Sequence, residues 1–182
     1  MIIIGITGKA RSGKTSVANF LKQHIKRQCK IIAFADSLKD EVARACGVTT
    51  QHIELHKDVF RPMLQWWGTD YKRNNVSKDY WIQKVGEKIL CETDNTCIII
   101  PDVRFKNELE WVDQFDTGYT VKVVRSHGPT IPQSQHISET ELADCRTDFI
   151  IDNSGTLEEL EKQTVALIEQ INETLHKKAQ LK

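Results

Sequence analysis

The 182-residue sequence has no excess of charge of either sign, because 25 lysines and arginines balance 25 aspartates and glutamates. A neutral chain gives no support to nucleic acid or an anionic membrane surface as the main partner, so any basic site must be local. The five cysteines form no CxxC pair, which disfavours a disulfide framework or zinc site and indicates reduced thiols. The apolar N-terminal run is too short to span a membrane and leads into a glycine-rich loop, which indicates a cytoplasmic protein.

Short runs of β-branched residues alternate with longer helical patterns, along a chain whose length fits one domain. The apolar runs predict five strands, at residues 1–7, 30–36, 97–102, 119–125 and 149–152. We therefore predict a three-layer α/β fold over residues 1–182, in which a five-stranded parallel sheet carries helices on both faces. Such sheets bind ligands outside the carboxyl ends of their strands.

Helical spacing fills the segments between these strands. One helix is expected to start near Lys14, another to end at Gly47, and Pro62 suits the start of a third. Thr156 and Glu159 form a capping-box signature for the last helix. Its apolar face is predicted to carry Leu157, Leu160, Leu167, Ile171 and Leu175, and the helix before the third strand to bury Trp81, Val85 and Ile89.

Residues 8–15, GKARSGKT, match the P-loop pattern G-x-x-x-x-G-K-[ST] in full, between a predicted strand and a predicted helix. Its glycines let successive N–H groups point at a phosphate, and the helix adds its positive end. Lys14 can reach the β- and γ-phosphate oxygens and the Thr15 hydroxyl suits Mg²⁺, whereas Lys9 and Arg11 are expected to be solvated. The residues that we assign to the triphosphate are Gly8, Ala10, Ser12, Gly13, Lys14, Thr15 and Ser16.

Two carboxylates close predicted strands. Asp36 ends the second strand, where it can face the γ-phosphate, bind Mg²⁺ through water or touch the acceptor; the alternative is a helix cap. Asp102 closes CIIIPD in the manner of a Walker B strand, and Arg104 can neutralise phosphate charge at the same edge. Asn107 and Glu108 either join this site or form the first turn of a helix.

The segments 60–73 and 126–142 supply candidates for the acceptor side. Arg61 and Gln65 lie four residues apart, so that one can hold a phosphate and the other read a base edge, whereas Trp66 stacks on a ligand or packs in the core. Residues 126–142, rich in Pro, Ser, Gln and His, predict a mobile lid that ends in a cap of Ser138 and Glu141. The cap does not account for His136 and Glu139, which are left to face the acceptor.

Taken together, these stretches resemble the phage-type deoxynucleoside monophosphate kinases. The matching segments are GKARSGKT, FADSLK, RPMLQWWGTDYKR, PDVRFKNE, HISE and FIIDNSGTLEEL, in that order over nearly the whole chain. The resemblance implies the P-loop nucleoside monophosphate kinase fold. It also implies transfer of the γ-phosphate of ATP, with Mg²⁺, to a deoxynucleoside 5′-monophosphate for DNA synthesis, in the host cytoplasm if the gene is phage-encoded.

The resemblance also places residues around each substrate. It puts Asn153 and Gly155 beside the adenine of ATP and closes His136 and Glu139 over the acceptor. The Mg²⁺ on Thr15 would be held through water by Asp36 or Asp102. The other residues that we assign to the acceptor are Asp36, Lys39, Arg61, Gln65, Trp66, Arg73, Asp102 and Arg104.

Many nucleoside monophosphate kinases bring several arginines from the lid onto the transferring phosphoryl group, but residues 126–142 contain no Arg or Lys. Arg73, Arg104, Arg125 or Arg146 must then supply that charge, and we favour Arg104 and Arg125. Direct in-line transfer follows from this set, because phosphoryl transfer depends mainly on positioning and charge neutralisation. The residues expected to act in catalysis are Lys14, Asp36, Arg104 and Arg125.

Two other classes of function fit parts of the pattern. One is a kinase for phosphomevalonate, dephospho-coenzyme A or another small phosphate. The other is a nucleotide-dependent switch, which the absence of an NKxD element disfavours. A DNA-acting ATPase is disfavoured by the neutral charge. The expected partners are small nucleotides, and a homodimer through the aromatic helices in the middle of the chain is compatible with the sequence.

Overall fold

The structure is a computed structural model that describes residues 1–126, 137–142 and 144–180, without the side chain of Glu139. His136 and most of the predicted lid therefore lie outside the described residues. Among the helices that are described, none is both long enough and apolar enough to cross a membrane.

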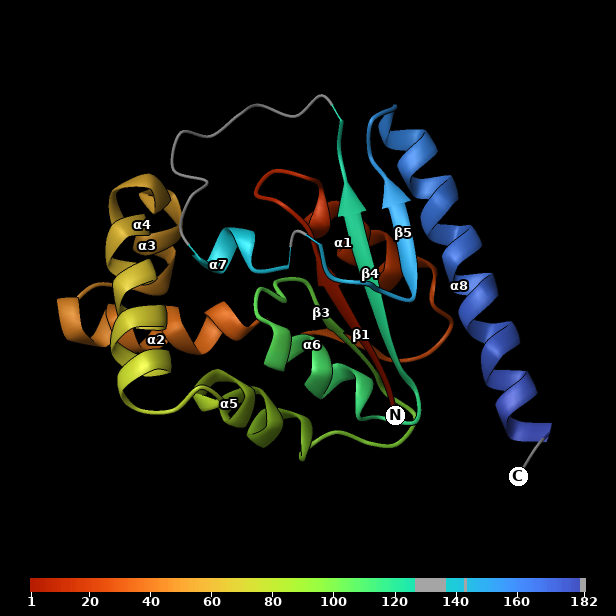
Figure 1. The fold of residues 1–182 in the computed structure, drawn as a ribbon, viewed down its shortest axis with the longest axis horizontal. Helices are drawn as coiled ribbons and strands as arrows, with labels where there is room; N and C mark the ends of the chain where they lie inside the picture. The colour runs from red at the N-terminus through yellow and green to blue at the C-terminus, as the bar shows by residue number, and fades with distance from the viewer. Residues whose placement is uncertain (127–136, 143, 181–182) are drawn as a thin grey trace. The chain divides into compact units, whose positions relative to one another are not determined.

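Five parallel strands form one sheet in the order β2-β3-β1-β4-β5 (Figure 1). Their bounds are Ile2–Thr7 for β1, Cys29–Ile31 for β2, Cys97–Ile100 for β3, Gly118–Val124 for β4 and Phe149–Asp152 for β5. Ile4 pairs with Ile99 on one side and with Tyr119 on the other, and every residue of β1 is buried. The predicted five-stranded parallel sheet is confirmed.

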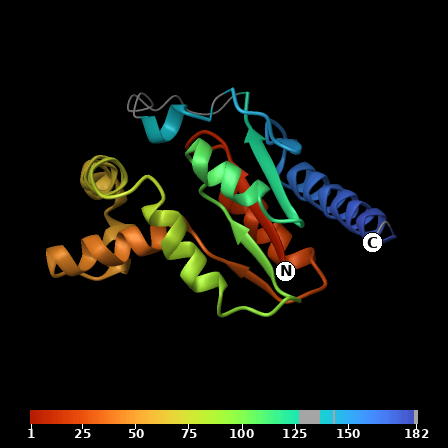
Figure 2. The ribbon, with the colours of Figure 1, turned by 60° about the horizontal axis from the view of Figure 1, so that its bottom comes forward.

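Helices cover both faces of this sheet. On one face, α1 (Lys14–His24) and α8 (Leu157–Gln180) pack with Ile2, Ile4 and Ile6 in a single apolar cluster. On the other face, α6 (Lys106–Asp113) brings the Val112 methyls close to Gly5. Figure 1 shows α6 in front of the sheet and α1 behind it, and α8 runs beside β5 in both views (Figures 1 and 2). The three-layer arrangement follows from the alternation of side chains along β1.

The start of α8 agrees with its predicted cap. The Thr156 N–H donates to the Glu159 carboxylate at 2.8 Å, and the Glu159 N–H donates to the Thr156 hydroxyl at 3.2 Å. The apolar face is buried at Leu160, Leu167 and Ile171. Leu175 is partly buried against the same core, whereas Leu157 has 63% of its surface exposed and lines the open cavity described below.

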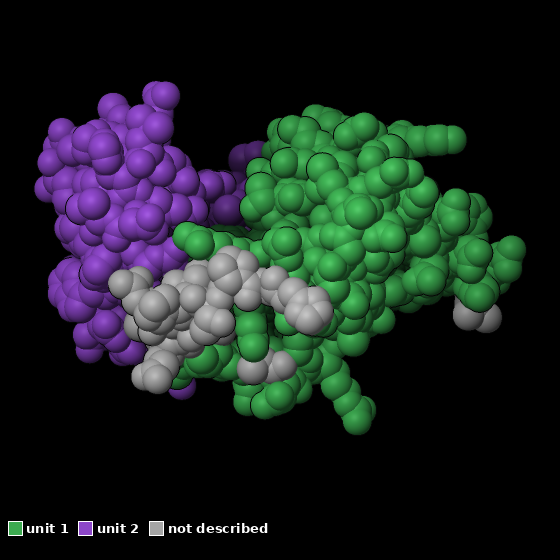
Figure 3. Space-filling model, turned by 90° about the horizontal axis from the view of Figure 1, so that it is seen from above, with its two compact units in different colours: residues 1–31, 92–182 green, residues 32–91 purple. Residues whose placement is uncertain are grey.

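The chain divides into two compact units (Figure 3). The sheet unit comprises Met1–Ile31 and Glu92–Lys182, and the helical unit comprises Ile32–Cys91. That the two units together form a single domain over residues 1–182 stays a prediction. The helices of the second unit are α2 (Phe34–Cys46), α3 (Thr50–Leu55), α4 (Lys57–Gln65), the π-helix η1 (Trp66–Arg73) and α5 (Tyr80–Ile89).

The predicted strand at residues 30–36 is wrong in its second half. β2 ends at Ile31, and α2 begins at Phe34. Asp36 therefore does not end a strand. It is the third residue of α2, and its carboxylate accepts the Ala33 N–H at 2.9 Å. The alternative prediction, that Asp36 caps a helix, is closer to the structure. A carboxylate at this position satisfies an N–H that the helix leaves unbonded.

Two other local predictions need correction, whereas Trp81, Val85 and Ile89 are buried on α5 as predicted. Pro62 lies inside α4 and not at its start, because the chain is already helical from Thr50 onward with a short break at His56. Ser138 does not cap a helix together with Glu141. It lies within α7 (Ile137–Thr140), and the Glu141 carboxylate accepts the Lys106 N–H of α6 at 2.8 Å.

A hydrogen-bonded cluster around Glu41 joins α2, η1 and α5 within the helical unit. The carboxylate accepts from Trp67 Nε1 at 3.0 Å and from the Tyr80 hydroxyl at 2.6 Å, and Lys72 Nζ lies 3.1 Å away. Burial alone would raise the pKa of Glu41, but hydrogen bonds from Tyr80, Trp67 and Lys72 outweigh it and lower the pKa. π-Helices are rare in proteins, and those that occur often lie at functional sites. Here the side-chain contacts of Glu41 hold one in place.

Replacing Ile99 by Ala should lower the free energy of unfolding by about 2–5 kcal/mol, because the side chain is wholly buried in β3 and its removal leaves a cavity. The matched change is Ile150→Ala in β5, where 68% of the residue is exposed, and we expect a change within about 0.5 kcal/mol. Chemical denaturation measures both. Equal effects would contradict the assignment of β3 to the interior of the sheet.

Glu41→Gln should destabilise the protein by about 1–3 kcal/mol at pH 7, because one of the two acceptor oxygens becomes a donor. The pKa of Glu41 lies below its ordinary value of 4.5, so the ionised carboxylate stabilises the fold above that pH and ceases to do so as the pH falls through the lowered pKa. The difference between variant and wild type should therefore shrink below about pH 4.5.

Glu87→Gln is the control, because this carboxylate is two-thirds exposed and pairs only loosely with Lys84 at 3.4 Å. Denaturant titrations at several pH values decide the matter. A Glu41→Gln effect that is independent of pH, or no larger than that of Glu87→Gln, would show that the cluster does not hold η1.

Candidate functional site

The P-loop connects β1 to α1 and depends on two glycines. Gly8 has a φ of 145° and Gly13 a φ of 105°, values that residues with side chains rarely adopt. A Cβ on Gly8 would lie 2.3 Å from the Val123 carbonyl oxygen, and a Cβ on Gly13 would lie 2.2 Å from Asn153 Nδ2. Both conformation and space therefore require glycine at these positions, as the P-loop pattern predicts.

Lys14 lies at the start of α1 and folds back over the loop. Its ammonium group donates to the Gly8 carbonyl at 2.7 Å and to the Lys9 carbonyl at 2.8 Å. The Ser12 N–H donates to the same Lys9 carbonyl at 3.1 Å, and the Ser12 hydroxyl is buried with no hydrogen-bond partner among the described residues. The loop thus holds a cation beside backbone N–H groups and the amino end of a helix, which is the arrangement that binds phosphate.

A cavity of about 410 Å³ opens beside this loop within the sheet unit. This volume is in the range of small-molecule sites. Its lining comprises Arg11, Gly13, Lys14, Thr15, Ser16, Arg125, Asn153, Gly155, Leu157 and Leu160. The structure therefore brings together most of the residues that we assigned to ATP, and it adds Arg125, one of the two arginines favoured for catalysis. Gly8, Ala10 and Ser12 belong to the loop but not to the lining.

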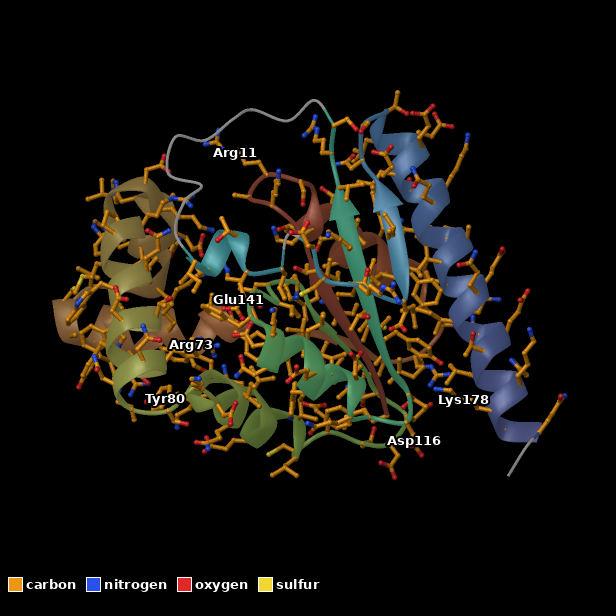
Figure 4. All side chains as sticks on the ribbon, in the orientation of Figure 1. Arg11, Arg73, Tyr80, Asp116, Glu141 and Lys178 are labelled. Atoms are coloured by element: carbon orange, nitrogen blue, oxygen red, sulfur yellow. The ribbon has the colours of Figure 1, made fainter. Side chains whose placement is uncertain are left out.

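Three lining residues were missed from the sequence. The sequence predicts a solvated Arg11, and this residue is exposed on the loop between β1 and α1 (Figure 4), where it also lines the cavity. For Leu157 and Leu160, the sequence pattern predicts only helix packing. The available signal was their position directly after the capped turn at the carboxyl end of the last strand, the edge where ligands of parallel sheets bind.

The loop that follows β5 is bonded to two neighbouring segments. The Asn153 N–H donates to the Val124 carbonyl at 2.8 Å, and its side-chain Nδ2 donates to the Ser12 carbonyl at 2.8 Å. The Ser154 hydroxyl accepts the Ser126 N–H at 2.9 Å and donates to the Asp152 carboxylate. Asn153 therefore joins the cavity wall to the P-loop itself.

Asp102 and Arg104 follow β3 at the carboxyl edge of the sheet. The intervening Val103 N–H donates to the Ile6 carbonyl at 3.1 Å, which ties this turn to β1. The Arg104 N–H donates to the Glu108 carboxylate at 2.7 Å, and Glu108 is only 4% exposed. Glu108 thus caps the first turn of α6, in agreement with the prediction that this segment begins a helix. It fixes the backbone from which Arg104 extends.

The other predicted acceptor residues belong to the helical unit. Asp36 and Lys39 lie three residues apart on α2, and Lys39 forms an ion pair with Glu54 that lowers the pKa of that carboxyl group. Arg61 and Gln65 lie one turn apart on α4, as their spacing predicts. An acceptor phosphate on Lys39 would have to compete with Glu54.

The ends of the π-helix hold the remaining candidates. Trp66 is 53% exposed and stacks on Tyr71 at 5.6 Å between ring centroids, so it is not a core residue. Arg73 Nη1 donates to the Lys78 carbonyl at 2.8 Å. Gln65 Nε2 is buried and makes no hydrogen bond within the described part of the chain. A buried amide nitrogen in that state can donate to water or to a bound polar group.

The sequence is similar to known kinases. A family model described as deoxynucleotide monophosphate kinase matches residues 54–164. A protein of Acanthamoeba polyphaga mimivirus, provisionally described as a deoxynucleotide monophosphate kinase, is 27% identical over 193 aligned positions, which cover 93% of this chain and 97% of that protein.

Solved structures resemble the fold at low sequence identity. A gluconokinase from Sinorhizobium meliloti 1021 aligns with a TM-score of 0.56 and 15% identity, over 97% of each chain. A sugar kinase from Janibacter sp. HTCC2649 aligns with a TM-score of 0.53 and 14% identity, over 93% of this chain and 95% of that one. These structures support a P-loop kinase fold, and the family match covers more than half of the sequence. The chain belongs to the deoxynucleotide monophosphate kinase family.

Proposed function

We propose that this protein transfers the γ-phosphate of ATP to a deoxynucleoside 5′-monophosphate and releases ADP and the deoxynucleoside diphosphate. The observation that carries the proposal is the cavity in which the P-loop, Arg125 and the loop after β5 meet. Family membership supports a phosphate-bearing nucleotide as the acceptor.

On the donor side, the chain's own groups bind and orient the triphosphate. Backbone N–H groups of the P-loop and the amino end of α1 would hold the phosphates, and Lys14 would exchange its two carbonyl partners for phosphate oxygens. Thr15, at the exposed first turn of α1, would hold Mg²⁺ together with Asp102 through water. When bound, Mg²⁺ supplies charge neutralisation at the phosphates.

On the acceptor side, Arg61 would hold the 5′-phosphate and Gln65 would pair with a base edge, with Lys39, Trp66 and Arg73 nearby. The Nε2 of Gln65, which is buried and makes no hydrogen bond among the described residues, supports this role. Because the acceptor oxygen is already anionic, no strong general base is needed. Arg104 and Arg125 would stabilise the negative charge on the phosphoryl group during in-line transfer, in place of lid arginines.

Lys14→Ala should reduce phosphotransfer at saturating ATP by about 100-fold or more, because it removes the cation next to the transferring phosphate. Lys22→Ala is the matched control on the last turn of the same helix and should retain wild-type activity. Steady-state rates of ADP formation measure both. Near-normal transfer by Lys14→Ala would overturn the proposed donor site.

The acceptor is tested by coupled ADP release with ATP and each of the four deoxynucleoside monophosphates. We expect at least one of them to raise the rate well above the rate with ATP alone. Phosphomevalonate and dephospho-coenzyme A serve as the competing acceptors. Stimulation by either of these, with none from any deoxynucleotide, would replace the proposed acceptor.

A further inference from the structure

Asn153 makes a contact that binding of a base does not require. Its side-chain nitrogen donates to the carbonyl oxygen of Ser12, 141 residues away in the sequence and inside the P-loop. The contact is close, since a single added carbon on Gly13 would lie 2.2 Å from the same nitrogen. Asn153 is therefore fitted against the peptide that joins Ser12 to Gly13.

The orientation of this peptide determines where the Gly13 N–H points. The carbonyl and the N–H of a trans peptide point in opposite directions within one rigid plane. A donor that holds the Ser12 carbonyl therefore also sets the direction of the Gly13 N–H, which points away from Asn153. Gly13 lines the cavity next to Lys14 and Thr15, and its φ of 105° places it outside the helix that begins at Lys14.

The backbone at Asn153 is held in place by hydrogen bonds. Its N–H donates to the Val124 carbonyl at 2.8 Å, which extends the pairing of β5 with β4 by one residue. The preceding Asp152 exchanges two hydrogen bonds with the Gln163 side chain of α8, at 3.1 and 2.8 Å. A side chain held in this way can transmit the position of the sheet to the P-loop.

We propose that Asn153 is a positioning residue for the phosphate loop, and that it does not read the base of the donor nucleotide. Its amide orients the Ser12–Gly13 peptide so that the Gly13 N–H faces the bound phosphates. The inference rests on the proposed function only in taking a triphosphate as the ligand of the P-loop, and it is independent of the acceptor.

The test separates phosphate from base. Binding of inorganic tripolyphosphate with Mg²⁺, of ATP with Mg²⁺ and of adenosine is measured by calorimetry for wild type and Asn153→Ala. We expect about 3- to 10-fold weaker binding of both tripolyphosphate and ATP, the range that one lost hydrogen bond gives, and unchanged binding of adenosine. Asn172→Ala on the exposed side of α8 is the control and should leave all three unchanged.

Asn153→Asp supplies a second measurement, including the case in which the alanine variant does not fold. Near pH 7 its carboxylate faces the Ser12 carbonyl without a proton to donate, so tripolyphosphate binding should weaken further. As the pH falls toward the ordinary aspartate pKa of about 3.9, the protonated group becomes a donor again. The affinity relative to wild type at the same pH should therefore recover, which a merely structural role would not produce.

The opposite pattern would overturn the inference. Weaker adenosine binding with unchanged tripolyphosphate binding would make Asn153 a base-reading residue, and equal affinities of variant and wild type for tripolyphosphate would remove its positioning role. Failure of the wild-type protein to bind tripolyphosphate would overturn the triphosphate site and this inference together. Failure of every deoxynucleotide as an acceptor would overturn the proposed reaction and leave this inference standing.

Discussion

The burial of β1 between β3 and β4 is the constraint on which the rest of the sheet unit depends. Ile3, Ile4 and Ile6 have no exposed surface, and burial of each such side chain stabilises the fold by about 1.5–3 kcal/mol. Because β1 is paired on both sides, its end cannot shift along the sheet. The chain must therefore leave the sheet at Gly8, directly against the Val123 carbonyl of β4.

Two features determine the shape of the phosphate loop: the point at which the chain leaves β1, and a contact with a segment distant in the sequence. Lys14 closes the loop from within, through two carbonyls that lie five and six residues before it. Asn153, which directly follows β5, holds the loop from outside by donating to the Ser12 carbonyl. One contact is local and follows from the motif, whereas the other exists only because parallel strands end at a common edge.

The helical unit solves a different problem, which is to hold an irregular segment in one conformation. A π-helix is rare in proteins, and here side chains help to hold it in place. Glu41 does so by accepting from two aromatic side chains and pairing with Lys72. The exposed Trp66 and the buried amide of Gln65 flank the start of this segment, and both are therefore presented by a fixed backbone.

The sequence alone determined the sheet, the P-loop with its two required glycines, and the capped last helix, because each depends on residues that are close together in the chain. It misplaced Asp36, because an apolar run before an acid suits both the end of a strand and the start of a helix. The hydrogen bond from the Ala33 N–H shows that Asp36 lies at a helix start. The sequence also missed Leu157 as a cavity residue and the contact of Asn153 with Ser12. Only the tertiary structure decided these, because the order of the strands brings together segments that no local pattern connects.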